Sequence, residues 1–218
     1  MRTVFEEELS QLDAQLLVMG AAIEEAVRGA LASLQSRDAE AAQAIVRGDA
    51  EINRMERDIE GLCLRIMLTQ QPVAHDLRIV SGALRMVADM ERIGDQAADI
   101  AEISASLADE MDARISEHLE AMGSHVRDML HAAIASFVAR DASAARDIMA
   151  MDEKVDADFA RLKSDVVEGI RSAGDAPEVL VDALMMAKYL ERIGDHAENI
   201  AEWVEYAVTG HYKGTVIS

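Results

Sequence analysis

The chain has 218 residues, half of them apolar and 28% charged, so it is long enough to bury a sizeable hydrophobic core. Its 21 Lys and Arg residues against 41 Asp and Glu residues give a net charge of −20, which disfavours binding to nucleic acid and to anionic membrane surfaces. A single cysteine, Cys63, excludes an intramolecular disulfide and a cysteine-rich zinc site.

The composition predicts an all-α fold. Only two prolines occur and aromatic residues make up 3% of the chain, whereas the strong helix formers Ala, Leu, Met, Glu and Arg dominate. The acidic N-terminal segment has no basic region followed by an apolar stretch, so we expect no signal peptide. The longest apolar runs are far shorter than the ~20 residues of a membrane span. We therefore expect a cytoplasmic protein.

Apolar stripes of helical period predict six helices, the first two of which lie in residues 1–70. Thr3 and Glu6 have the spacing of a capping box and would open a first helix that runs to about residue 34. Asp38 is a suitable cap for a second helix that ends near residue 70, with a candidate break at Gly48.

The third and fourth helices follow a proline and a pair of aspartates. Pro72 interrupts the second helical pattern, and a third helix is expected from about residue 76 to residue 107. Asp109 and Asp112 mark the start of the fourth helix, which runs to about residue 139.

The last two helices are also bounded by capping and breaking residues. Asp141 can cap a fifth helix that reaches about residue 170, where the segment 172–174 stops it. Asp175 and Glu178 form a second capping box, and the sixth helix runs to about residue 208, just before Gly210.

The two halves of the chain repeat each other. ERIGDQAADIAE at 91–102 matches ERIGDHAENIAE at 191–202 in nine of twelve positions, and RDAEAAQAIVRGDAEIN at 37–53 matches RDASAARDIMAMDEKVD at 140–156 in seven of seventeen. The simplest architecture is a duplicated three-helix bundle of long antiparallel helices. We expect a first bundle in residues 1–107, a second in 108–210 and a C-terminal tail in 211–218.

The third and sixth helices each carry an acidic stripe opposite an apolar one. At 100° per residue, one face of the third helix carries Glu91, Asp95, Asp99 and Glu102. The sixth helix repeats this arrangement with Glu191, Asp195, Glu198, Asn199 and Glu202. A solvated helix face is one explanation, because charged runs on amphipathic helices usually face water.

A cation site is the other explanation, and the residues leave the two open. Like charges at i, i+4 disfavour a helix, whereas carboxylate oxygens suit Mg²⁺, Ca²⁺, Mn²⁺ and iron. The neighbouring helices offer further oxygen pairs at the same spacing, Asp49 with Asn53 and Asp152 with Asp156. Each half therefore has the residues for one oxygen-rich site between two helices. Mid-helix glycines beside both stripes, Gly94 and Gly194, point to a close approach of another helix or of a ligand.

These motifs resemble the PhoU family of accessory regulators of bacterial phosphate-specific transport. The resemblance rests on the two copies of an (E/D)xxxD helix motif, on QQPVAHDLR at 70–78 and on ERIGDHAENIAEWVEYAVTG at 191–210, and it covers nearly the whole chain. It implies two three-helix bundles, a homodimer, and iron or zinc clusters at the motifs. It also implies a negative regulator of the phosphate-starvation response that contacts the transporter's ATPase, PstB, and the membrane sensor kinase, PhoR.

The family's metal motifs carry over to this chain residue by residue. Glu91 and Asp95 match the first motif, and Glu191 and Asp195 match the second. Asp152 and Asp156 match the partner motif of the second half. In the first half Asp49 matches, but Asn53 replaces a carboxylate, so we expect the second-half site to hold metal more readily. Gln96 also stands where many members have the histidine that is His196 here.

Three classes of function fit these residues. The resemblance favours a regulatory binding protein of phosphate homeostasis that is not an enzyme. The second class is a metal-free helical adaptor that uses its acidic faces for protein–protein contacts. A metal-dependent hydrolase is the third, and turnover of a phosphate ester only with added metal would indicate it.

Overall fold

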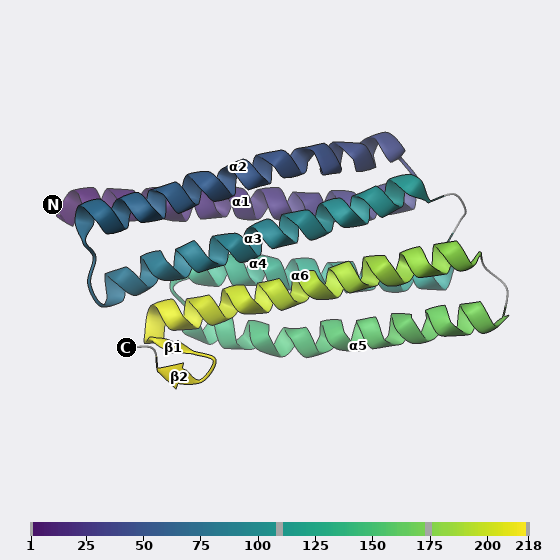
Figure 1. Ribbon diagram of the computed structural model, residues 1–218. Helices are drawn as coiled ribbons and strands as arrows, with labels where there is room; N and C mark the ends of the chain where they lie inside the picture. The colour runs from purple at the N-terminus through teal and green to yellow at the C-terminus, as the bar shows by residue number, and fades with distance from the viewer. Residues whose placement is uncertain (1, 108–110, 173–175, 217–218) are drawn as a thin grey trace.

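The computed structural model describes residues 2–107, 111–172 and 176–216, and within them the fold is all-α, as the sequence predicts (Figure 1). The elements are α1 (Arg2–Ser36), α2 (Ala39–Gln70), α3 (His75–Ser106), α4 (Ala113–Ala139), α5 (Ala142–Ser172), α6 (Pro177–Thr209), β1 (His211–Tyr212) and β2 (Thr215–Val216).

The helices form two layers. Figure 1 shows α2, α3, α6 and α5 side by side in that order, with α1 and α4 behind them. Helices α1 to α3 make one three-helix bundle and α4 to α6 make the other, and the two bundles meet where α3 packs against α6 and α1 against α4. The two repeats therefore lie on either side of the contact between α3 and α6, which we call the seam.

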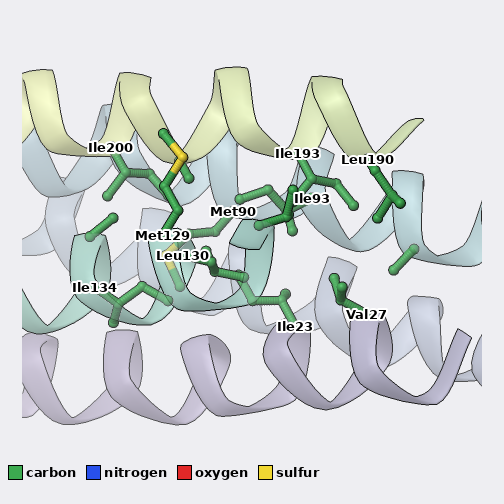
Figure 2. Packing of buried hydrophobic residues seen from close by; sticks show 14 of the residues in the cluster. Ile23, Val27, Met90, Ile93, Met129, Leu130, Ile134, Leu190, Ile193 and Ile200 are labelled. Carbon is green, nitrogen blue, oxygen red and sulfur yellow. The ribbon is translucent and has the colours of Figure 1, made fainter. Parts of the chain in front are cut away.

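One hydrophobic core runs through both bundles. Figure 2 shows side chains from α1, α3, α4 and α6 meeting in it, among them Ile23, Met90, Leu130 and Ile193, all fully buried. The expected boundary between residues 107 and 108 falls between α3 and α4, and whether it separates independent domains stays a prediction. No helix of the described residues is long and apolar enough to cross a lipid bilayer.

Three predicted aspartate caps are confirmed. The carboxylate of Asp38 accepts hydrogen bonds of 3.0 Å from the backbone N–H groups of Glu40 and Ala41. Asp112 and Asp141 do the same at the starts of α4 and α5. These bonds satisfy backbone donors that the first turn of a helix leaves without a partner.

Three details of the predicted helices are wrong. Helix α1 already includes Arg2 and Thr3, so Thr3 is not a cap. Helix α2 continues through Gly48 without a break. Helix α6 is preceded by Ala176, whose side chain makes no capping bond, and Pro177 in the first turn supplies a favourable backbone angle instead. Asp109 and Asp175 lie outside the described residues.

The C-terminal tail folds into a hairpin that the sequence analysis did not predict. Gly210 ends α6 in the left-handed region with φ 82°, as its position after the last helical turn suggests. Two residues with positive φ, Lys213 at 48° and Gly214 at 73°, then join β1 to β2. Two-residue turns with positive φ at both positions match the twist of antiparallel strands.

Candidate functional site

The repeated glycines bring the helices that carry the acidic residues close together. A Cβ atom on Gly94 of α3 would lie 2.9 Å from Cγ2 of Ile52 on α2, and one on Gly194 of α6 would lie 3.1 Å from Cγ1 of Val155 on α5. Gly in a helix costs about 1 kcal/mol relative to Ala. The close helix approach, one of the two explanations expected from the sequence, accounts for that cost.

The first acidic cluster lies between α2 and α3 and contains Asp49, Asn53, Glu56, Glu91, Asp95 and Asp99. The side-chain amide of Asn53 donates a 2.8 Å hydrogen bond to Oδ2 of Asp49. Oδ1 of Asp49 and Oδ1 of Asn53 are both buried, and neither accepts a hydrogen bond from the described residues. Buried oxygens normally have a donor, so these two are available to a cation.

Burial and mutual repulsion raise the pKa of carboxyl groups in the first acidic cluster. Burial, followed by the charge of Asp95, raises the pKa of Asp49, of Glu91 and of Asp99. Arg92 offsets part of this charge, with Nε 3.6 Å from Glu91 and a guanidinium nitrogen 3.9 Å from Asp95. The cluster therefore holds more negative charge than the nearby arginine neutralises.

The second acidic cluster lies between α5 and α6 and contains Asp152, Asp156, Glu191, Asp195, Glu198 and Glu202. Burial raises the pKa of Asp152 to about 6, with further contributions from the carboxylates of Glu198, Asp156, Asp195 and Glu191. Two lysines reach its ends: Lys188 pairs with Glu191, and Nζ of Lys213 lies 3.0 Å from Oε2 of Glu202. The second cluster therefore contains both a carboxyl group with a strongly raised pKa, Asp152, and two lysine side chains that pair with its carboxylates.

Two of the predicted site residues, Asn199 and Asp99, lie toward the seam between the bundles. The side-chain amide of Asn199 is 3.3 Å from Oδ1 of Asp89 on α3, and Nδ1 of His196 is 2.9 Å from the same oxygen. Asp99 of α3 is near Arg192 of α6, whose charge lowers the pKa of Asp99 and offsets part of its rise. Asn199 therefore bonds across the seam to α3.

Sequence reasoning left out three carboxylates that belong to these surroundings. Glu56 lies seven residues, or two helical turns, after Asp49, so the helical period was a sufficient signal for it. Glu198 and Glu202 were placed on the acidic stripe of the sixth helix but not among the metal ligands.

The two clusters have suitable donor atoms but not a preformed metal geometry. Within the described residues, no three His, Cys, Asp or Glu side chains are arranged to hold one ion. Ionised carboxylates repel one another without a counter-ion, so binding requires their side chains to converge. The unpartnered oxygens of Asp49 and Asn53 and the all-oxygen donor sets fit a hard cation, and metal binding stays a prediction.

Comparisons with known proteins identify relatives of the whole chain. The PhoU domain model matches residues 16–104 and again residues 119–204, one match in each repeat. The phosphate-specific transport system accessory protein PhoU of Escherichia coli is 31% identical over 94% of this chain and 86% of its own length. The PhoU homolog of Clostridium acetobutylicum is 32% identical over 96% of both chains.

Solved structures agree with the predicted architecture. The crystal structure of PhoU from Pseudomonas aeruginosa superposes with a TM-score of 0.90 at 34% identity, covering 95% of this chain and all of that one. The phosphate transport system regulatory protein PhoU from Streptococcus pneumoniae gives 0.89 at 29% identity, over 98% and 99%. These matches confirm the fold of two three-helix bundles.

Proposed function

This chain belongs to the PhoU family, and from that membership we propose that it is an accessory protein of phosphate-specific transport that regulates phosphate homeostasis. Its relatives are named as accessory and regulatory proteins, which confirms the prediction that it is not an enzyme. The observation that carries the proposal is the family match in both repeats, over the helices that hold the two acidic clusters.

The proposed mechanism is docking of this protein on cytoplasmic partners. It restrains the phosphate-starvation response by contacting the transporter ATPase, PstB, and the sensor kinase, PhoR, and so reaches the inner membrane through them. A net charge of −20 supports binding to basic partner surfaces, since complementary charge speeds association. The acidic clusters are the natural contact points if the protein acts as a metal-free adaptor, the alternative function.

Metal binding is part of the same proposal. Carboxylates of the two clusters would hold iron or zinc, with Mg²⁺, Mn²⁺ or Ca²⁺ as chemically suitable substitutes. A bound cation supplies positive charge that neutralises the cluster. The residues of this chain supply the oxygens, from α2 and α3 in the first cluster and from α5 and α6 in the second. Such a cation would link the two helices of each cluster and make the surface that partners contact less negative.

We expect the protein to be a homodimer, as the family resemblance implies. Exposed apolar side chains at the end of α2 and in the turn that follows it support this: Leu68 is 78% exposed and Val73 74%. Size-exclusion chromatography with light scattering should give a mass near twice the 23.7 kDa of one chain. A mass of one chain at micromolar concentration would contradict this expectation.

The regulatory role is tested by alkaline phosphatase activity in phosphate-rich medium. Deleting the gene should raise the activity, and adding back the wild-type gene should restore repression, because the protein restrains the starvation response. The double variant Asp95→Asn plus Asp195→Asn should fail to restore it if the acidic clusters are needed.

A matched control separates the clusters from total charge. Asp128→Asn plus Asp147→Asn removes the same charge from exposed positions on α4 and α5 and should repress like wild type. Unchanged activity after deletion would contradict the regulatory proposal. If the cluster variant represses normally and the purified wild type contains no metal, the metal part fails and the adaptor function is favoured.

A further inference from the structure

The C-terminal hairpin lies beside the end of α6 (Figure 1), and its Lys213 contacts Glu202 of the second acidic cluster. The backbone N–H of Gly210 donates a 2.8 Å hydrogen bond to the carbonyl of Tyr206, and the N–H of His211 donates to the hydroxyl of Thr209 at 3.1 Å. The first bond completes the last helical turn, and the left-handed conformation of Gly210, with φ 82°, turns the chain after it. The tail is therefore held against the helix that carries half of the second cluster.

Aromatic stacking holds the hairpin in this position. The ring of Tyr212 lies 4.1 Å from that of Trp203 on α6 with an interplanar angle of 16°. Trp203 also meets Tyr206 edge-on at 5.9 Å, and the guanidinium of Arg85 on α3 lies 5.9 Å from its ring. Such contacts stabilise a small hairpin that has too few strands to be stable alone.

The turn of the hairpin brings a cation to the cluster. Lys213 occupies the left-handed region, where Gly or Asn is usual, and its ammonium lies 3.0 Å from Oε2 of Glu202. The Glu202 side chain is only 12% exposed, so water solvates it poorly and the lysine is its main counter-charge. Glu198 lies four residues before Glu202 and so shares its face of α6 at the same end of the cluster.

The first cluster lacks an equivalent within the described chain. Glu102 is the counterpart of Glu202 in the first repeat, and its side chain is exposed. After Glu102, α3 ends at Ser106, and the described residues between it and α4 include no strand. The two clusters therefore differ in their internal counter-ions although their motifs repeat.

We propose that the C-terminal hairpin is a strap whose lysine, Lys213, competes with metal cations for the second acidic cluster. With the strap docked, the ammonium neutralises Glu202 and Glu198 at one end of the cluster. A hard cation that draws Glu198 toward Asp195 and Asp156 takes over this role and releases the lysine. The inference rests on the proposed metal binding, and it makes the tail the element that sets the cation affinity of the second repeat.

The test measures terbium binding in the full-length protein. Tb³⁺ is a hard, oxygen-seeking cation whose luminescence is sensitised by a nearby indole, and the chain has one tryptophan, Trp203, next to Glu202. Lys213→Met removes the ammonium but keeps an apolar side chain against Tyr212. Lys163→Met removes the same charge from an exposed position on α5. Asp152→Asn plus Asp195→Asn identifies the signal that belongs to the second cluster.

We expect the midpoint for Tb³⁺ at the second cluster to be about two- to fivefold lower in Lys213→Met than in Lys163→Met, the range of a single partly exposed ion pair. Equal midpoints in the two variants would overturn the strap and leave the metal site standing. The absence of any saturable signal that depends on Asp152 and Asp195 would overturn both the strap and metal binding at this cluster.

Discussion

Replacing Gly94 with Leu is expected to destabilise the protein by about 1–3 kcal/mol, the usual cost of overpacking a well-packed interface. A Cβ at this position would lie 2.9 Å from Cγ2 of Ile52 and 3.1 Å from its Cδ1. Because Cγ2 is bonded directly to Cβ, it cannot move away without moving the Ile52 side chain or α2 itself. The extra atoms of leucine should therefore push α2 away from α3.

The control for this prediction is Gly48→Leu on α2, where an added Cβ would meet nothing within 4 Å. Both substitutions remove a helical glycine, which alone favours folding by up to about 1 kcal/mol. Only Gly94→Leu adds the clash, so the difference between the two free energies of unfolding in urea isolates it. Equal stabilities would show that α2 and α3 are not held in contact through Gly94.

The same substitution links packing to the acidic cluster. The added Cβ would lie 3.5 Å from Oδ1 of Asp49, one of the two buried oxygens without a donor. Displacing α2 would therefore move Asp49 relative to Glu91 and Asp95 on α3. Gly94→Leu should weaken cation binding at the first cluster and leave the second unaffected, as the two sites are built from different helices.

The helices themselves were predictable because their signals are local. Asp38, Asp112 and Asp141 cap the helices expected of them, since a cap needs only its own side chain and the next three residues. Thr3 matches the same pattern, but the prediction that it caps α1 is wrong because the helix begins before it. A capping box shows that a helix can start at a residue but not that the preceding residue stays outside.

The clusters were predictable only in part, because they depend on which helices are neighbours. The i, i+4 pairs placed Asp152 with Asp156 and Glu191 with Asp195 on single helix faces. That Asn199 bonds to Asp89 depends on α6 packing against α3 across the seam, which the period of one helix does not reveal. The position of Lys213 depends on a hairpin turn whose Lys-Gly sequence is not a usual signal for it.

Replacing Asp152 with Asn is expected to stabilise the metal-free protein above pH 7 by about 1 kcal/mol, after allowance for solvent screening of a partly exposed group. The pKa of Asp152 is about 6 in the folded protein against 3.8 for the free side chain, chiefly because of burial and then because of the carboxylates around it. The native state therefore binds more protons than the unfolded state between these two values. Stability falls as the pH rises through this window, and the loss is complete above it.

The stabilisation by Asp152→Asn should accordingly be absent near pH 4 and appear between pH 4 and pH 7. Asp147→Asn, the same change at an exposed position on α5, is the matched control. Unfolding in urea at both pH values measures this, and a constant difference between Asp152→Asn and wild type would contradict it. Added metal should invert the order, because a ligand of the native state stabilises by RT ln(1 + [L]/Kd), about 2.7 kcal/mol at 100 times Kd. The wild type has Asp152 to bind the cation and the variant does not, so a carboxylate that costs stability without metal would contribute stability with it.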